Sequence, residues 1–169
     1  IESFANVVSA PIFPCRRVTL DGPCQDPRAL AMSWIEKRKS PHWALISGTC
    51  LASEIHAWVA YNVLQRNQNR STMKSNSLDG EFIRLLSGTH HIATSFNRAG
   101  LCKGDTEAWI VDLSGQDIED DYSEHAEIMG FNLLEDRPDI SIFDAKRMGI
   151  NSNDDENAAI AHIHLADIR

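Results

Sequence analysis

Two adjacent histidines, His90 and His91, are the residues of this chain that most readily suggest chemistry. They follow a Ser-Gly-Thr turn at residues 87–89, within the stretch NSLDGEFIRLLSGTHHIATSF. Neighbouring residues on a helix point about 100° apart, so the two imidazoles are not expected to bind one metal ion together. No HExxH or HxxxH pattern accompanies them. We therefore expect no metal site here, and loop-packing or surface histidines are the simpler interpretation.

Catalysis has no recognised motif in this sequence. There is no GxSxG elbow for a nucleophile, and neither a P-loop nor a GxGxxG pattern for a nucleotide. The enzyme alternative is a small hydrolase or transferase that uses His90 and His91 with an acid from the run at 117–124. It requires these groups to lie within hydrogen-bond reach in one pocket. We expect no catalytic residue, cofactor or bound metal; a metal-binding regulator is the third alternative.

Three further histidines, His56, His162 and His164, are expected to be structural. His56 lies beside the apolar side of a helical pattern, where a core histidine with its hydrogen bonds satisfied is common. His162 and His164 are two residues apart near the C-terminus, and helical spacing points them in different directions. The sequence therefore favours no site built from these side chains.

Charge is distributed unevenly along the chain, whose formal net charge is −8. Residues 1–104 hold 12 Lys/Arg and 7 Asp/Glu, a net +5, whereas residues 105–169 hold 4 and 17, a net −13. The segment 55–78 contains basic residues but no acidic one. A solvated surface explains the acidic half, but the basic segment is a local cationic island suited to a polyanion.

The loop at residues 66–77 combines this positive charge with two predicted helix starts. Arg70 and Lys74 supply the charge, and Ser77 and Thr89 are predicted to cap the helices that follow. Helix N-termini present free backbone N–H groups to anions. Hydroxyls and histidine rings nearby add donors and surfaces on which a base can stack. The combination favours a phosphate or single-stranded RNA site over a catalytic one.

Composition predicts an ordinary globular domain. The chain has 169 residues, of which 43% are hydrophobic and 24% charged. No apolar run is long enough to span a membrane and no leader pattern is present, so we expect a cytoplasmic protein. The four cysteines include no CxxC pair. A disulfide between Cys15 and Cys24 is an alternative, but buried reduced thiols are favoured.

Hydrophobic periodicity divides the chain into short helices and a few strands. Strands are predicted at residues 3–9, 42–47 and 106–113. Helices are predicted at residues 27–39, 51–68, 78–87 and 90–99, within 123–134, and at 139–149 and 154–169. The fold class is therefore α/β (α+β): a single domain over residues 1–169, with a small mixed sheet flanked by several short helices.

Capping residues and helix-ending glycines accompany most of the predicted helices. The predicted N-caps are Asp26, Ser53, Ser77, Thr89 and Asn153. The predicted C-terminal glycines are Gly88, Gly100 and Gly149. On the helix at 90–99, Ile92 and Phe96 are expected to face inward.

The segment from Glu54 to Leu113 resembles a known family, the KEOPS/EKC subunit that binds the complex's small atypical kinase (the PRPK-binding protein family). The family pattern is a helix with a histidine, a Lys-containing loop, SLxxE, an SGT turn, a helix ending in Gly and a hydrophobic strand. The matching positions here are His56, Lys74, Ser77, Leu78, Glu81, Ser87, Gly88, Thr89, Ile92 and Gly100. The sequence departs from the archaeal pattern at His90, where relatives often carry a basic residue, and at Asp79-Gly80.

The resemblance implies a non-catalytic accessory subunit of an archaeal-type complex that makes the threonylcarbamoyl-adenosine modification of tRNA. Its partners would be the small kinase/ATPase subunit, which it stimulates, and the single-stranded CCA end of tRNA. The resemblance places the RNA contact at residues 74–78 and 87–90. The candidate nucleic-acid-binding residues are Arg70, Lys74, Asn76, Ser77, Leu78, Gly88, Thr89 and His90. For the kinase we expect an apolar helical surface around Ile160 and Ile163, although core packing explains these two residues equally well.

Overall fold

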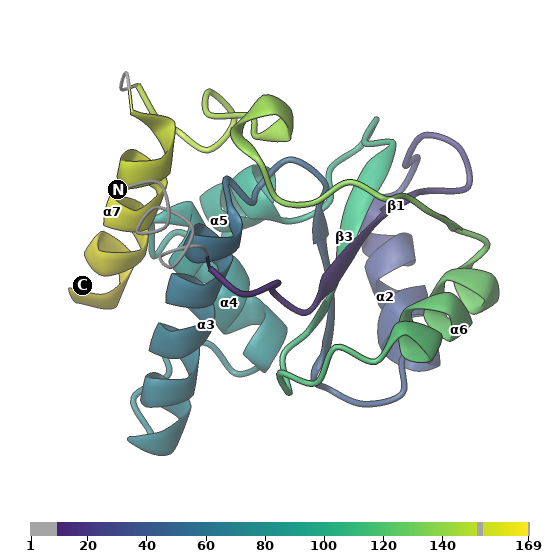
Figure 1. The fold of residues 1–169 in the computed structure, drawn as a ribbon, viewed down its shortest axis with the longest axis horizontal. Coiled ribbons are helices and arrows are strands. Elements are labelled where there is room, and N and C mark those ends of the chain that lie inside the picture. The colour runs from purple at the N-terminus through teal and green to yellow at the C-terminus, as the bar shows by residue number, and fades with distance from the viewer. Residues whose placement is uncertain (1–9, 152–153, 169) are drawn as a thin grey trace, which may run out of the picture.

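The computed structural model describes residues 10–151 and 154–168, with a four-stranded sheet at its centre (Figure 1). The strands are β1 (Cys15–Thr19), β2 (Trp43–Ser47), β3 (Glu107–Asp112) and β4 (Asn132–Leu133). Their order is β2-β3-β1-β4, and every pairing is antiparallel. The predicted α/β class is confirmed, but the sheet is antiparallel rather than mixed. Strand direction depends on the path of the connections, which hydrophobic periodicity does not encode.

Side-chain alternation gives the sheet two buried faces. On β3, Trp109 and Val111 belong to one hydrophobic cluster, whereas Ala108 and Ile110 belong to the other. A strand buried on both faces is apolar at successive positions, and this explains the continuous apolar run that identifies β3 in the sequence.

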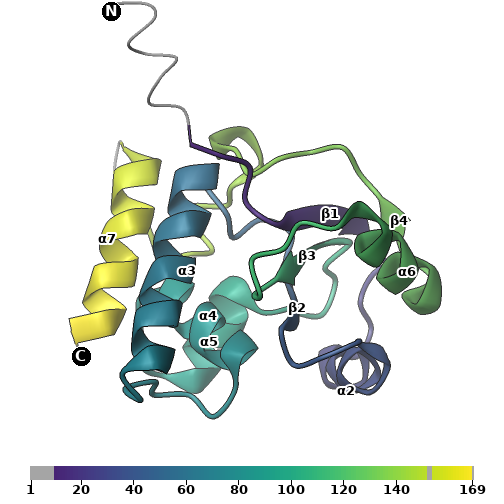
Figure 2. The ribbon, with the colours of Figure 1, turned by 60° about the horizontal axis from the view of Figure 1, so that its bottom comes forward.

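Helices cover both faces of the sheet. Packed over the first cluster are α3 (Glu54–Asn69), α4 (Leu78–Ser87), α5 (Ile92–Ala99) and α7 (Asp155–Ile168). Packed over the second are α2 (Pro27–Lys37) and α6 (Glu119–Met129). Figure 2 shows α7, α3 and the α4/α5 pair in succession on one side of the strands. Because α4 packs against α3, α5 and α7, it is the centre of its layer.

Five predicted helix ends are confirmed, among them Gly100 as the C-cap of α5. Asp26, Ser53 and Ser77 are the N-caps of α2, α3 and α4, and each side chain accepts a hydrogen bond from a backbone N–H three residues later. Gly88 ends α4 in the left-handed conformation, with φ of 72°. These local signals therefore fix the boundaries of the helices around the loop at 70–77.

The prediction for the start of α5 is wrong. The helix begins at Ile92, its N-cap is His91, and His91 makes no side-chain capping bond. The Thr89 hydroxyl instead accepts a hydrogen bond from the His91 N–H, 3.2 Å away, which holds a turn before the helix. The two histidines therefore precede the first helical turn rather than occupying it.

Two other predicted segments differ from the structure. Residues 139–149 form only a 3-10 turn, η1 (Ile140–Ile142), followed by irregular turns. The carboxylates of Asp139 and Asp144 bond to backbone N–H groups two and three residues later, which competes with a regular helix. Gly149 has a φ of 75°, as expected of a residue that ends a turn. The predicted strand at 3–9 and the cap at Asn153 fall outside the described residues.

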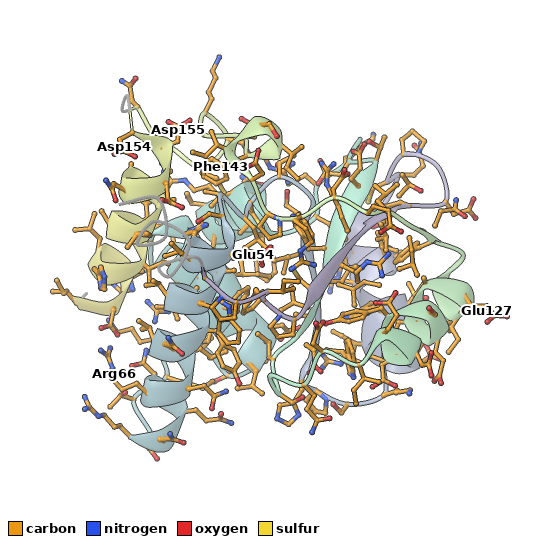
Figure 3. All side chains as sticks on the ribbon, in the orientation of Figure 1. Glu54, Arg66, Glu127, Phe143, Asp154 and Asp155 are labelled. Carbon is orange, nitrogen blue, oxygen red and sulfur yellow. The ribbon has the colours of Figure 1, made fainter. Side chains whose placement is uncertain are left out.

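Strand β1 is missed by sequence periodicity because two arginines interrupt its apolar pattern. Arg16 pairs with Glu119, and Arg17 donates a hydrogen bond to Asp136, 3.0 Å away. Arg137 fixes the entry to this strand by donating to the Phe13 and Cys15 carbonyls and pairing with Glu54 (labelled in Figure 3). Ion pairing therefore lets a basic strand lie at the centre of the sheet.

All four cysteines are free thiols, so the alternative of a Cys15–Cys24 disulfide is not realised. Burial raises the pKa of the Cys50 thiol to about 12, which makes it an inert core group. In the described parts of the chain, no helix has both the length and the apolar character needed to cross a membrane.

Candidate nucleic-acid interface

A cavity of about 420 Å³ lies where the loop before α4 meets the start of α5. Its size is that of a small-molecule or nucleotide site. The lining residues come from the loop, from α4, and from the α4–α5 turn and α5: Lys74, Ser75, Asn76, Ser77, Gly80, Ile83, Arg84, His90, Ile92, Ser95 and Phe96. We call this the loop cavity. Segments up to 22 positions apart in the sequence thus share one concave surface.

Half of the predicted RNA-binding residues line the loop cavity. These are Lys74, Asn76, Ser77 and His90. Lys74 and Asn76 are exposed, and within the described residues Lys74 makes no salt bridge. The cavity therefore offers one cationic side chain without a salt bridge, Lys74, together with amide, hydroxyl and imidazole groups, as a polar and anionic ligand requires.

The other four predicted residues do not line the cavity. Arg70 is the C-cap of α3, at the far end of the loop, and Thr89 holds the turn before α5. Leu78 packs against the hydrophobic core. A Cβ on Gly88 would lie 2.8 Å from the His162 ring, so this glycine is required for close packing against α7. In the structure these residues shape the site rather than line it.

Two buried residues that sequence reasoning did not assign to the site, Glu81 and Arg84, anchor the loop. The Glu81 side chain is 0% exposed. One carboxylate oxygen accepts hydrogen bonds from the backbone N–H groups of Lys74 and Ser75, each at 3.2 Å. Arg84 donates to both Glu81 oxygens, at 3.0 and 2.9 Å. In the sequence, the one sign of this anchoring role is that Glu81 is the glutamate of the SLxxE pattern, which is part of the family resemblance.

The Glu81–Arg84 pair also reaches the last turn of α7. Arg84 donates to the Ala166 carbonyl at 2.6 Å, and Asn67 bridges Glu81 and Asp167 at 3.2 and 3.3 Å. Burial by itself raises the pKa of Glu81, but the hydrogen bonds and charge of Arg84 outweigh it and lower that pKa below its usual range. The carboxylate is therefore ionised and fully bonded at neutral pH.

The Arg66 guanidinium extends the same network at the surface. It pairs with Asp167, and Figure 3 shows Arg66 near the end of α3 that faces the last turn of α7. A basic residue of the cationic island is thus used for packing. Within the described residues, Lys74 is the island's one basic side chain that lines the loop cavity.

The two helix starts beside the cavity differ in their electrostatics. At α4, Ser77 caps the Gly80 N–H at 3.1 Å, and the acidic Asp79 and Glu81 occupy the first turn. At α5, there is no side-chain cap and no acidic residue in the first turn. The positive end of the helix dipole is compensated at α4 and uncompensated at α5, so the start of α5 is better suited to a phosphate.

The enzyme alternative requires a pocket that the structure does not form. The acids of 117–124 lie at and before α6, which packs against α2 and the edge strand β4. Helix α5 packs against α4 and β2, the strand at the opposite edge of the sheet. Asp121 and Glu124 pair with Lys39 at 2.6 and 2.8 Å. His90 and His91 therefore share no site with this acidic run.

In the portions 10–151 and 154–168, no group of three or more His, Cys, Asp or Glu side chains is arranged to hold a metal ion. His56 is fully buried, and its Nδ1 accepts a hydrogen bond from the Ala52 N–H at 3.0 Å. His56 is therefore a buried core histidine, as expected, but the expectation that its hydrogen bonds are satisfied is wrong, because its Nε2 has no partner within the described residues.

The two predicted kinase-binding residues occupy different environments on α7. Ile163 is 0% exposed and belongs to the hydrophobic core, so of the two alternatives that the sequence leaves open for it, the structure shows core packing. Ile160 is half-buried, whereas Leu165 and Ile168 are exposed on the same helix. The apolar spacing of α7 thus serves core packing first, and its accessible apolar groups lie mainly in the last turn.

Comparison with known families identifies the chain's relatives. No curated protein matches it significantly. The family model described as "Kinase binding protein CGI-121" matches residues 24–148, which run from just before α2 to just before Gly149 and include the whole loop cavity. The match covers well over half of the chain's 169 residues. The chain therefore belongs to the CGI-121 family of kinase-binding proteins.

Proposed function

We propose that this protein is a non-catalytic subunit of a KEOPS complex. It binds and stimulates the small atypical kinase/ATPase subunit, and it recruits tRNA through the single-stranded 3′ CCA end. In this role it supports the threonylcarbamoyl-adenosine modification of tRNA. The observation that carries the RNA half is the loop cavity, which brings Lys74, Asn76 and Ser77 together with His90.

Three properties of the loop cavity support a single-stranded RNA end. It is concave and about 420 Å³ in volume, so it accepts an unstacked nucleotide rather than the side of a duplex. Lys74 provides a cation for a phosphate, and the uncompensated start of α5 adds a positive dipole end. Phe96 provides an aromatic surface on which a base can stack.

The acidic half of the chain is compatible with this function because many of its charges are internally paired. Asp136 pairs with Arg17, Asp105 with Arg147, and Asp121 with Lys39. Helix α6, which begins with three acidic residues, lies at the edge of the sheet opposite α5. The strongest local repulsion of RNA thus falls away from the proposed contact.

The surface that binds the kinase is a separate proposal. We place it on the accessible side of α7, where Ile160 is partly exposed and Leu165 and Ile168 are exposed. Co-purification of the small kinase subunit with the wild-type chain and with Leu165→Glu tests this location, with and without tRNA. Loss of capture by the variant is the expected result. Undiminished capture would move the surface to the residues 24–148 that match the family.

The RNA half is tested by reversing the charge at Lys74. We expect Lys74→Glu to weaken binding of tRNA with an intact 3′ end by about tenfold, or about 1.4 kcal/mol, with an unchanged melting temperature. Lys146→Glu is the matched control, because Lys146 is also exposed and makes no salt bridge within the described residues. Equal affinity of the wild-type protein for tRNA with and without CCA would contradict the proposal.

A further inference from the structure

A second cavity, of about 450 Å³, adjoins the loop cavity on the side of α2. The two share a wall made of Ser77, Gly80, Ile83 and Phe96. Most of the remaining lining is hydrocarbon or aromatic: Pro27, Ala31, Trp34, Ile35, Leu45, Gly100 and Leu101, with Arg28, Arg38 and Asp79 as its charged members. We call it the α2 cavity. The two cavities therefore lie on either side of residues at the start of α4 and on α5.

The shared wall exists because α5 turns its apolar residues outward. The sequence predicts Ile92 and Phe96 to face the core, but they are 74% and 47% exposed. The buried residues of α5 are Ser95 and Ala99, whose small side chains let the helix pack closely on α4; the Ser95 hydroxyl lies 3.1 Å from that of Ser87. An apolar helix face is thus left uncovered beside two cavities, as expected of a ligand-binding surface.

Each cavity is lined by a cationic side chain that does not line the other. Lys74 lines only the loop cavity and Arg28 lines only the α2 cavity. Within the described residues neither makes a salt bridge, whereas Arg38 is paired with Asp79 at 3.2 Å. Two unpaired cations separated by an apolar, partly aromatic wall match a strand in which phosphates alternate with bases.

We propose that the α2 cavity is a second nucleotide subsite. A base stacks on the side of Phe96 that faces α2, and Arg28 contacts the adjacent phosphate. This inference rests on the proposed function, since the loop cavity supplies the first subsite of the same strand. The shared lining residues, together with a cation without a salt bridge in each cavity, favour RNA over a peptide, which would need no cation in each of two adjoining apolar cavities.

The experiment measures binding of tRNA that carries 2-aminopurine at the 3′-terminal position or at the position before it. With the wild-type protein, we expect stacking on Phe96 to change the fluorescence at one of these positions. Phe96→Ala abolishes that change and weakens affinity about tenfold, and Phe96→Tyr, which keeps the stacking ring, restores both. Arg28→Gln reduces the dependence of log affinity on log salt by about one phosphate contact. Ile128→Ala, at an exposed apolar position of α6, is the control.

The outcomes separate this inference from the proposed function. Because Phe96 lines both cavities, Arg28→Gln separates the two proposals: if Lys74→Glu weakens tRNA binding but Arg28→Gln does not change its salt dependence, the α2 subsite is overturned and the loop cavity stands. If none of the Lys74, Phe96 and Arg28 variants affects binding, the proposed function falls as well. If the Phe96 and Arg28 variants instead lose the kinase subunit and keep full affinity for tRNA, the occupant is a protein and the subsite is overturned. Melting curves of each variant identify any that fail to fold.

Discussion

Helices α4 and α5 both border the loop cavity, but they are built for different purposes. Helix α4 is capped by Ser77, carries compensating acids in its first turn, and is buried from Glu81 to Ser87. Helix α5 has no side-chain cap, buries only Ser95 and Ala99, and exposes its large apolar residues. The comparison shows that α4 fixes the position of the site, whereas α5 exposes apolar side chains beside it. Stability and binding should therefore separate when the two helices are altered.

The largest effect is expected at the buried ion pair of α4. Glu81→Gln leaves the Arg84 guanidinium buried with only part of its bonding, which costs about 3 kcal/mol of unfolding free energy. The variant also releases the loop, so the amides of Lys74 and Ser75 should exchange with solvent faster in native-state hydrogen exchange. Glu127→Gln, on the exposed side of α6, is the control. Unchanged exchange at 74 and 75 would show that Glu81 does not anchor the loop.

A second test measures how acidification changes the stability of the helical layer formed by α3, α4, α5 and α7. Burial, with a smaller contribution from the nearby His162, lowers the pKa of His56 from 6.5 to about 3. The folded state therefore holds His56 in its neutral form. Because the unfolded chain takes up a proton at this histidine near pH 6.5, the stability is complete above pH 6.5 and is lost as the pH falls toward 3. For His56 the loss at pH 5 is about 2 kcal/mol.

Urea unfolding at a series of pH values measures this dependence. His56→Asn should flatten the profile between pH 7 and pH 5, whereas His42→Gln, at a half-exposed position, should leave its slope intact. Burial, and to a smaller extent the charge of Arg98, lower the pKa of His162, which adds to the profile with the same sign. A wild-type profile that is flat from pH 7 to pH 5 would contradict the assignment of His56 as a buried neutral residue.

The smallest effect directly compares the two helix starts. Ser77→Ala removes the cap of α4 and should cost about 1 kcal/mol. Thr89→Ala removes a turn bond outside α5 and should cost less than about 0.5 kcal/mol. Chemical unfolding of both variants provides the comparison. Equal losses would mean that Thr89 contributes as much to stability as a true N-cap does.

Local sequence signals predict much of the fold. The caps at Asp26, Ser53 and Ser77 and the glycine at Gly88 are read directly from residue type, because each needs only a few neighbouring residues to act. Strand β1 could not be predicted, since Arg16 and Arg17 are accommodated by acids more than 100 positions away in the sequence. A strand that depends on ion pairs with residues distant in the sequence cannot be predicted from the local spacing of apolar residues.

The candidate site shows the same limit. Lys74, Asn76, Ser77 and His90 are chosen from the sequence and lie together in the structure. The outward face of α5 is missed because an apolar stripe is ordinarily a core stripe, and only the packing of Ser95 against α4 reveals the opposite orientation. The α2 cavity is missed for a further reason: its walls come from three helices and a strand, and its residues on α2 and β2 belong to no recognised motif.

The bonds of Glu81 and Arg84 have a thermodynamic consequence. The same pair holds the backbone at residues 74 and 75 and the last turn of α7, through the Ala166 carbonyl. Lifting that turn deprives Arg84 of a partner, and disturbing the loop deprives Glu81 of two. The order of the loop at residues 74 and 75 and the order of the last turn of α7 therefore depend on the same pair of side chains. Linkage of this kind is reciprocal. Under the proposed function, the factor by which a kinase bound to the end of α7 raises the affinity for RNA must equal the factor by which RNA raises the affinity for that kinase.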